Sequence, residues 1–198
     1  MILEGIITTI NPDGTANISP MGPRVDDTLR RFVLRPYQSS TTYRNLKRTG
    51  QAVFHVTDDV ELLARAALGS PVPPPPMEPA EAFDGWILSG ACRWYALRVE
   101  SLDDSNERTE IVCDVVAHRR LRDFFGFSRA KHAVVEAAIL ATRTQFLDGD
   151  DVLAHFERLR PLVAKTGGPA EQRAFDYLAA YVAEQYETRA VQADAHDE

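Results

Sequence analysis

The sequence is best understood from residues 35–46, which read Arg35-Pro36-Tyr37-Gln38-Ser39-Ser40-Thr41-Thr42-Tyr43-Arg44-Asn45-Leu46. This stretch follows a short apolar run that predicts a strand, and it opens a helix expected to run from about residue 41 to Gly50. Four hydroxyl side chains therefore lie at a helix N-terminus, where backbone N–H groups lack intrahelical partners and the helix dipole favours negative charge. Arg35 and Arg44 flank them and can add charge-assisted hydrogen bonds to a phosphate. The stretch predicts either an anion site or an ordinary capped helix, because Ser and Thr are also common N-caps.

The residues around this stretch predict a largely antiparallel β domain. Residues 2–10 are rich in β-branched side chains, and the turn sequence Asn11-Pro12-Asp13-Gly14 follows, so residues 15–19 should form the return strand of a hairpin. Pro20 is expected to end that strand, because proline has no N–H for the ladder. Further elements are predicted as strands at residues 51–57, 86–91, 92–102 and 110–118, and as a helix at residues 58–68. Together these elements suggest a barrel.

After residue 122 the apolar spacing becomes helical. Small apolar residues recur from Ala130 to Ala141, and larger ones mark two further helices over about residues 152–163 and 175–186. The polar tail from Thr188 is expected to fray. We therefore predict two domains, a barrel over residues 1–122 and a three-helix C-terminal domain over residues 123–198 that ends in a frayed tail.

Composition and charge narrow the classes of function. The 198 residues carry a formal net charge of −7 with a pI near 5.3, which argues against a nucleic-acid surface but leaves room for a small anionic ligand. Cys92 and Cys113 lie in apolar, strand-like segments without metal-ligand spacing, which predicts buried free thiols and no metal. The first residues lack a signal-peptide pattern, and no apolar run could span a bilayer, so a cytoplasmic protein without a membrane partner is expected.

Three segments resemble a known group of proteins. Residues 8–22 (TTINPDGTANISPMG), together with residues 39–46 (SSTTYRNL) and 49–53 (TGQAV), resemble the front half of the FMN-binding split barrels, the superfamily of flavin reductases and pyridoxamine-phosphate-oxidase-like proteins. With residues 125–133 (FGFSRAKHA), nearly the whole chain is similar to the domain of unknown function 447 family within that superfamily. The resemblance implies a six-stranded antiparallel split barrel, usually a homodimer with two FMN molecules near the subunit interface.

The resemblance also implies which residues bind the cofactor. Beside the isoalloxazine ring it places Asn17, Ser19, Pro20, Met21 and Gly22. Around the ribityl phosphate it places Ser39, Ser40, Thr41 and Thr42, with Arg35 as the countercharge. His55 departs from the pattern, because many relatives have Asn on the analogous strand. Its imidazole could hydrogen-bond the flavin edge or a phosphate, or it could be a satisfied polar group of the core.

The function implied by the resemblance is that of an FMN-dependent oxidoreductase or reductase acting on an unidentified small substrate. The sequence contains no nucleophile–base pair, Walker motif, Rossmann fingerprint or metal cluster. That absence fits a flavoenzyme, since the flavin supplies its own redox chemistry. It equally fits a non-enzymatic flavin-binding or carrier module. A third hypothesis is a different anionic cofactor, such as a deazaflavin or haem. The sequence assigns no catalytic residue and no electron donor.

Overall fold

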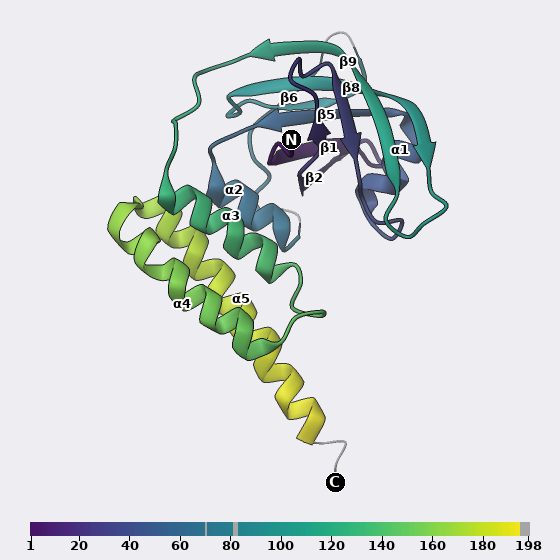
Figure 1. The fold of residues 1–198 in the computed structure, drawn as a ribbon. Helices are drawn as coiled ribbons and strands as arrows, with labels where there is room; N and C mark the ends of the chain where they lie inside the picture. Colours follow the sequence, from purple (N-terminus) through teal and green to yellow (C-terminus); the bar gives the residue numbers. More distant parts are fainter. Residues whose placement is uncertain (70, 81–82, 195–198) are drawn as a thin grey trace. The chain divides into compact units, whose positions relative to one another are not determined.

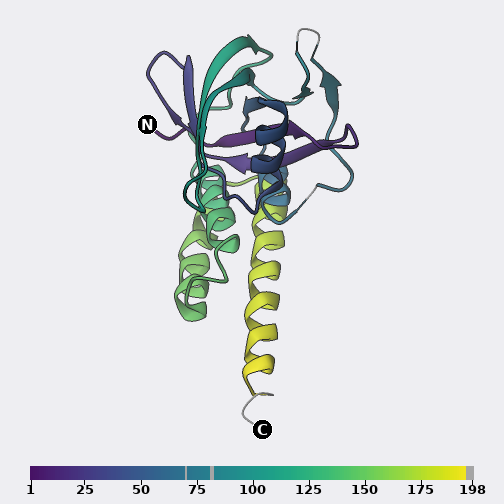
Figure 2. The same ribbon diagram turned by 90° about the vertical axis from the view of Figure 1, so that its right-hand side faces the viewer.

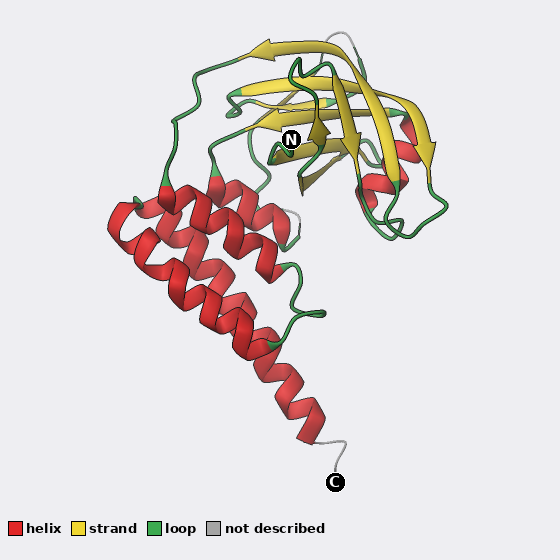
Figure 3. Ribbon diagram, viewed as in Figure 1, coloured by secondary structure: helices red, strands yellow, loops and turns green. Residues whose placement is uncertain are grey.

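The computed structural model describes residues 1–69, 71–80 and 83–194, and the chain divides into two compact units. The first comprises residues 1–59 and 70–125 and contains the strands of the described residues; the second comprises residues 60–69 and 126–198 and is helical (Figures 1 and 3). Helix α2 (Val60–Ala67) belongs to the second unit, although strands of the first unit precede and follow it in the sequence. The domain boundary between residues 122 and 123 stays a prediction.

The first unit is a curled antiparallel sheet that forms a half-barrel. Its strands follow the order β2 (Ala16–Met21), β1 (Gly5–Ile10), β5 (Gln51–Val56), β8 (Arg93–Asp103), β9 (Glu110–Arg120), β4 (Arg31–Leu34) and β3 (Arg24–Val25). Two further strands, β6 (Met77–Pro79) and β7 (Trp86–Leu88), form a separate antiparallel pair. Helix α1 (Thr41–Thr49) lies over the β1–β2 hairpin (Figure 2).

Two strand predictions were wrong in detail. The main sheet has seven strands rather than the six that the resemblance implies. One of the seven is the two-residue strand β3, which pairs with β4 and is too short to leave an alternating pattern in the sequence. Strand β2 also continues through Pro20 to Met21 instead of ending at the proline. It is an edge strand, and an edge position tolerates a residue that lacks an N–H. The predicted antiparallel pairing is confirmed.

The core of the half-barrel fixes the strand that leads into α1. Phe32 on β4 packs against Phe54 and Tyr95, with ring centroids 5.4 and 5.3 Å apart. Helix α1 begins after the N-cap Ser40 and ends at Gly50, whose φ of 67° suits a residue without a side chain. The predicted helix is thereby confirmed. Both cysteines are buried free thiols, as predicted.

The second unit contains α2, α3 (Arg129–Ala141), α4 (Gly149–Thr166) and α5 (Pro169–Asp194). The three C-terminal helices match the predicted number, and α2 packs against α3 and α5 as a fourth member. Helix α5 continues past Thr188, where fraying was predicted, while residues 195–198 lie outside the described residues. Among the described residues, no helix combines the length and apolar character needed to cross a membrane.

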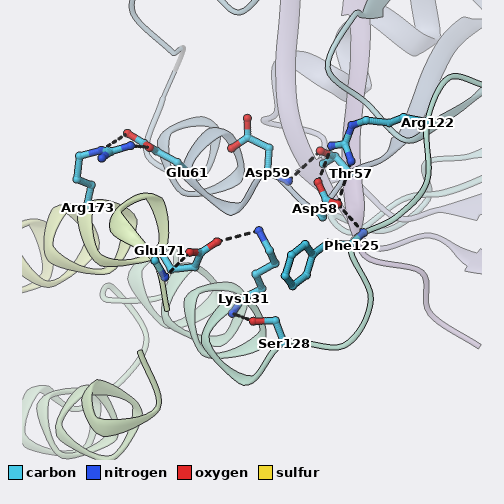
Figure 4. Close-up of polar contacts among 11 residues, drawn as sticks. Thr57, Asp58, Asp59, Glu61, Arg122, Phe125, Ser128, Lys131, Glu171 and Arg173 are labelled. Atoms are coloured by element: carbon cyan, nitrogen blue, oxygen red, sulfur yellow. Dashed lines mark hydrogen bonds and ion pairs between the residues drawn. The ribbon is translucent and has the colours of Figure 1, made fainter. Parts of the chain in front are cut away.

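A mostly buried ion pair joins α3 to α5 within the second unit. The Lys131 ammonium lies 2.8 Å from a carboxylate oxygen of Glu171, whose other oxygen accepts from the Gly168 N–H at 2.8 Å (Figure 4). The hydrogen bond from Lys131 lowers the pKa of Glu171. Both side chains are mostly buried, so each charge depends on the other.

Candidate functional site

The loop between β4 and α1 is held on the turn between β8 and β9. The Pro36 carbonyl accepts hydrogen bonds from the N–H and the hydroxyl of Thr109, at 3.0 and 2.7 Å. The Gln38 N–H donates to the Glu107 carbonyl at 2.9 Å, and the Gln38 side chain donates to two further carbonyls of that turn. These contacts fix the place where α1 begins.

The hydroxyls at the start of α1 have different environments. Ser40 Oγ accepts from the Tyr43 N–H at 3.1 Å and donates to the Tyr37 carbonyl at 2.7 Å. Thr41 Oγ1 accepts from the Arg44 guanidinium at 3.0 Å. The capping alternative therefore accounts for Ser40, whose hydroxyl has both a donor and an acceptor within the fold.

Several donors near this helix start have no acceptor within the described part of the chain. The N–H groups of Thr41 and Thr42 precede the first intrahelical hydrogen bond, and no other acceptor meets them. The Ser39 hydroxyl is exposed and makes no hydrogen bond there. Upstream, the Arg35 Nε is buried without a partner. A buried donor without an acceptor costs free energy, so this set of groups favours an anion.

Asn17 and Thr42 are brought together by a polar network under α1. The Asn17 side-chain amide donates to Thr42 Oγ1 at 3.0 Å and to Thr9 Oγ1 at 3.1 Å. The Asn45 amide also donates to Thr9 Oγ1 at 3.1 Å. Sequence reasoning missed Thr9 and Asn45. The position of Asn45, one helical turn after Thr42, could have revealed it, whereas nothing in the strand pattern singles out Thr9.

The predicted ring-side residues do not all lie on one face of β2. Asn17, Ser19 and Met21 alternate along the strand and share a face, while Pro20 points to the other. Gly22 follows the strand, and a Cβ there would lie 2.9 Å from both carboxylate oxygens of Glu4. A side chain at this position would therefore have to displace the Glu4 carboxylate.

His55 is a satisfied polar group of the core. It is 0% exposed, its Nε2 accepts from the Leu88 N–H at 3.1 Å, and its Nδ1 lies 3.3 Å from the Ile6 carbonyl and therefore carries the proton. Burial lowers its pKa to about 3 and keeps the ring neutral. Since the fold uses both ring nitrogens, the imidazole has no free nitrogen for a cofactor.

A further cation that was not predicted lies against the loop before α1. The Arg108 guanidinium stacks over the Tyr37 ring, 5.7 Å from its centroid, and its Nε donates to the Arg35 carbonyl at 3.4 Å. An isolated β-bridge between Tyr37 and Arg108 brings these distant parts of the sequence together. No local pattern could have indicated this contact.

Comparisons with known proteins identify the family. The N-terminal domain model of the family described as protein of unknown function DUF447 matches residues 3–122, and its C-terminal model matches residues 128–180. No curated protein matches the sequence.

Solved structures show the same fold. A crystal structure of an FMN-bound DUF447 protein from Methanosarcina mazei is 24% identical, with a TM-score of 0.77 over 91% of this chain and 94% of that one. A flavin reductase domain protein from Arthrobacter sp. FB24 is 19% identical, with a TM-score of 0.52 over 61% of this chain and 79% of that one. An FMN-binding protein from Thermus thermophilus with bound 1-cyclohex-2-enone is 16% identical, with a TM-score of 0.51 over 60% and 70%. The chain thus belongs to the DUF447 family, and its half-barrel has the fold of the FMN-binding split-barrel superfamily.

Proposed function

We propose that this protein binds FMN and acts as a flavin-dependent oxidoreductase or reductase on a small substrate. The observation that carries the proposal is the set of donors without acceptors around the start of α1, together with the buried Nε of Arg35. These groups suit the phosphate of a flavin mononucleotide. The similarity to an FMN-bound member of the same family supports FMN as the ligand.

In this proposal the phosphate is held mainly by backbone groups. The N–H groups of Thr41 and Thr42 and the hydroxyls of Ser39 and Thr41 donate to it, and Arg35 supplies the countercharge. Ser40 contributes by capping the helix, since its hydroxyl is already used. The Thr42 hydroxyl accepts from Asn17, so its role is to fix the helix on the hairpin.

The isoalloxazine ring is proposed to lie along β2, beside Asn17, Ser19 and Met21, with Pro20 and Gly22 shaping the end of the strand. When bound, FMN supplies hydride or electron transfer, and the protein orients it and leaves one ring face open to the substrate. Because β2 is an edge strand, a second copy of the chain can cover the site, and we propose a homodimer with the flavin near its interface. Sedimentation should give a dimer, and a flavin-loaded monomer would contradict this arrangement.

The phosphate contacts can be tested by measuring FMN affinity. Arg35→Gln, and separately Ser39→Ala combined with Thr41→Ala, should each weaken FMN binding about tenfold or more, because a charge-assisted hydrogen bond contributes about 1.5–3 kcal/mol. Fluorescence titration of the apoprotein measures the change. Arg31→Gln is the matched control, since Arg31 lies on the strand just upstream and pairs with Glu100 at the surface. Unchanged affinity in both test variants would place the phosphate elsewhere.

The enzymatic part of the proposal has a separate test. The purified yellow protein should oxidise reduced nicotinamide with multiple turnovers when an electron acceptor is present. Tight FMN binding without turnover with any nicotinamide or acceptor would instead support the carrier module. An absorption spectrum without flavin bands would exclude FMN as the chromophore and bring back the deazaflavin or haem hypothesis.

A further inference from the structure

Two adjoining cavities are lined by residues of the half-barrel, and none of the residues proposed to hold FMN is among them. The first, of about 650 Å³, has mainly apolar walls that include Leu3, Val25 and Val56. The second, of about 880 Å³, has mainly polar walls. The cavities adjoin because four residues line both of them: Leu29, Arg93, Tyr95 and Arg120.

The second cavity is cationic. Its charged wall residues are four arginines and one aspartate: Arg30, Arg93, Arg119, Arg120 and Asp114. Arg120 is paired with Asp123, and Arg93 donates to the Tyr95 hydroxyl at 3.1 Å. Within the described ranges, the guanidinium groups of Arg30 and Arg119 meet no acceptor. Such an excess of positive charge at a concave surface favours an anion.

In the first cavity the guanidinium of Arg122 is already paired. It bonds both carboxylate oxygens of Asp58, at 2.5 and 3.0 Å, and the Phe125 N–H donates to the same carboxylate at 2.7 Å (Figure 4). The wall also includes the Asp26 and Asp27 carboxylates and the Met1 ammonium, which donates to the Val25 carbonyl at 3.1 Å. The rest of the wall is mainly apolar. The two cavities therefore differ in character, one suited to an apolar group and the other to an anionic one.

Leu29 lines both cavities and has an unusual backbone conformation. Its φ of 53° makes it the one residue other than glycine with a positive φ among the described residues. The Asp26 carboxylate enforces the turn by accepting from the N–H groups of Arg30 and Arg31, at 3.1 and 3.4 Å. Such backbone strain is common at ligand sites, and here it directs a large apolar side chain to the wall shared by both cavities.

We propose that this double cavity is a second binding site, for a small organic anion. The apolar body of the ligand lies in the first cavity, against Leu29 and Val56. Its carboxylate or phosphate group lies in the second cavity and pairs with Arg30 and with the N–H groups of Arg93 that the Tyr95 hydroxyl does not use. The proposal does not depend on flavin binding, because it rests on different residues.

Phenyl phosphate is a suitable probe, with benzyl alcohol as its neutral counterpart and inorganic phosphate as the counterpart without an apolar body. In NMR titrations of the full-length labelled protein, phenyl phosphate should shift the amide signals of Leu29, Arg30 and Tyr95 and bind at least tenfold more tightly than either counterpart. Arg93→Gln and Arg30→Gln should each weaken it about tenfold. Arg98→Gln is the control, since this exposed arginine on β8 lines neither cavity.

Three results would overturn the proposal. Equal binding of benzyl alcohol would show that the arginines do not select an anion, and this comparison needs only the unaltered protein. Equal loss of affinity in Arg98→Gln would indicate general surface attraction. Displacement of phenyl phosphate by FMN, with the same signals shifting, would make the cavity the flavin site rather than a second one.

Discussion

The His55 imidazole and the Arg35 Nε are buried polar groups that differ in their hydrogen-bond partners. His55 has a partner for each ring nitrogen, whereas the Arg35 Nε has none. Because unsatisfied buried groups are uncommon in native folds, the arginine is the stronger indication of a ligand. Sequence alone could not separate the two residues, since the partners of His55 are backbone groups of β1 and β7 that only the folded sheet brings to it.

The buried imidazole makes stability depend on pH. The unfolded chain binds a proton at His55 below about pH 6.5, but the folded chain resists it until about pH 3. The stability that the neutral imidazole contributes is therefore fully present above the pKa of the unfolded chain, and it is progressively lost as the pH falls toward the pKa of the folded chain. From pH 7 to 5, this residue alone should lower the free energy of unfolding by about 2 kcal/mol.

Urea unfolding at both pH values, on the unaltered protein and on His55→Gln, measures this contribution. The glutamine variant should be less stable at pH 7 but lose less stability on acidification. His118→Gln, which alters an exposed histidine, should keep the full pH dependence. An identical pH dependence in His55→Gln would show that the imidazole is accessible to protons in the folded state.

At the scale of elements, the start of α1 combines a structural cap with proposed ligand donors. Ser40 performs the first role, while Ser39 and the amides of Thr41 and Thr42 remain available for the second. The sequence predicted the helix, its Gly50 cap and the hydroxyl cluster, because all three are local patterns. It could not show which hydroxyl caps the helix, because that choice depends on where the chain turns after Pro36.

The same limit explains the elements that were missed. Strand β3 has two residues, so it carries no periodicity, and its pairing with β4 comes from the turn that Asp26 enforces. The sequence places the end of β2 at Pro20, since a local pattern cannot show that this strand lies at the edge of the sheet, where a proline is tolerated. Arg108 reaches the α1 loop only through the long β8–β9 hairpin. The sequence indicated local features such as the helix and its caps. It did not indicate which distant segments pair with one another.

The capping role of Ser40 predicts that Ser40 and its neighbour Ser39 contribute differently to the free energy of unfolding. Ser40→Ala should lower the free energy of unfolding by about 1 kcal/mol, because the Tyr43 N–H loses its acceptor. Ser39→Ala should change it by less than about 0.5 kcal/mol, since this exposed hydroxyl has no partner in the fold. Urea unfolding without FMN measures both. Equal losses would mean that Ser39 also stabilises the helix start.

At the scale of the whole molecule, the two compact units do not follow the order of the sequence. Helix α2 lies between strands of the first unit in the sequence, yet it packs with α3 and α5. Its buried positions are Val60, Leu63, Ala64 and Ala66. The sequence predicted the helix but gave no sign of its partners, because an amphipathic stripe shows that a face is covered without showing what covers it.

This grouping can be tested by breaking the ion pair of the second unit. Lys131→Met leaves the mostly buried Glu171 without its countercharge and should destabilise the unit by roughly 3–5 kcal/mol. Hydrogen exchange should then accelerate in α2 together with α3, α4 and α5, with little change in the half-barrel. Glu157→Gln breaks an exposed ion pair and serves as the control, with an expected loss below about 1 kcal/mol. Protection of α2 that follows the half-barrel instead would contradict the grouping.

The placement of α2 also has a consequence for biosynthesis. A ribosome translates this helix before α3, α4 and α5, so its apolar face has no partner helices until they follow. The helical unit can therefore be completed only after α5 has been translated.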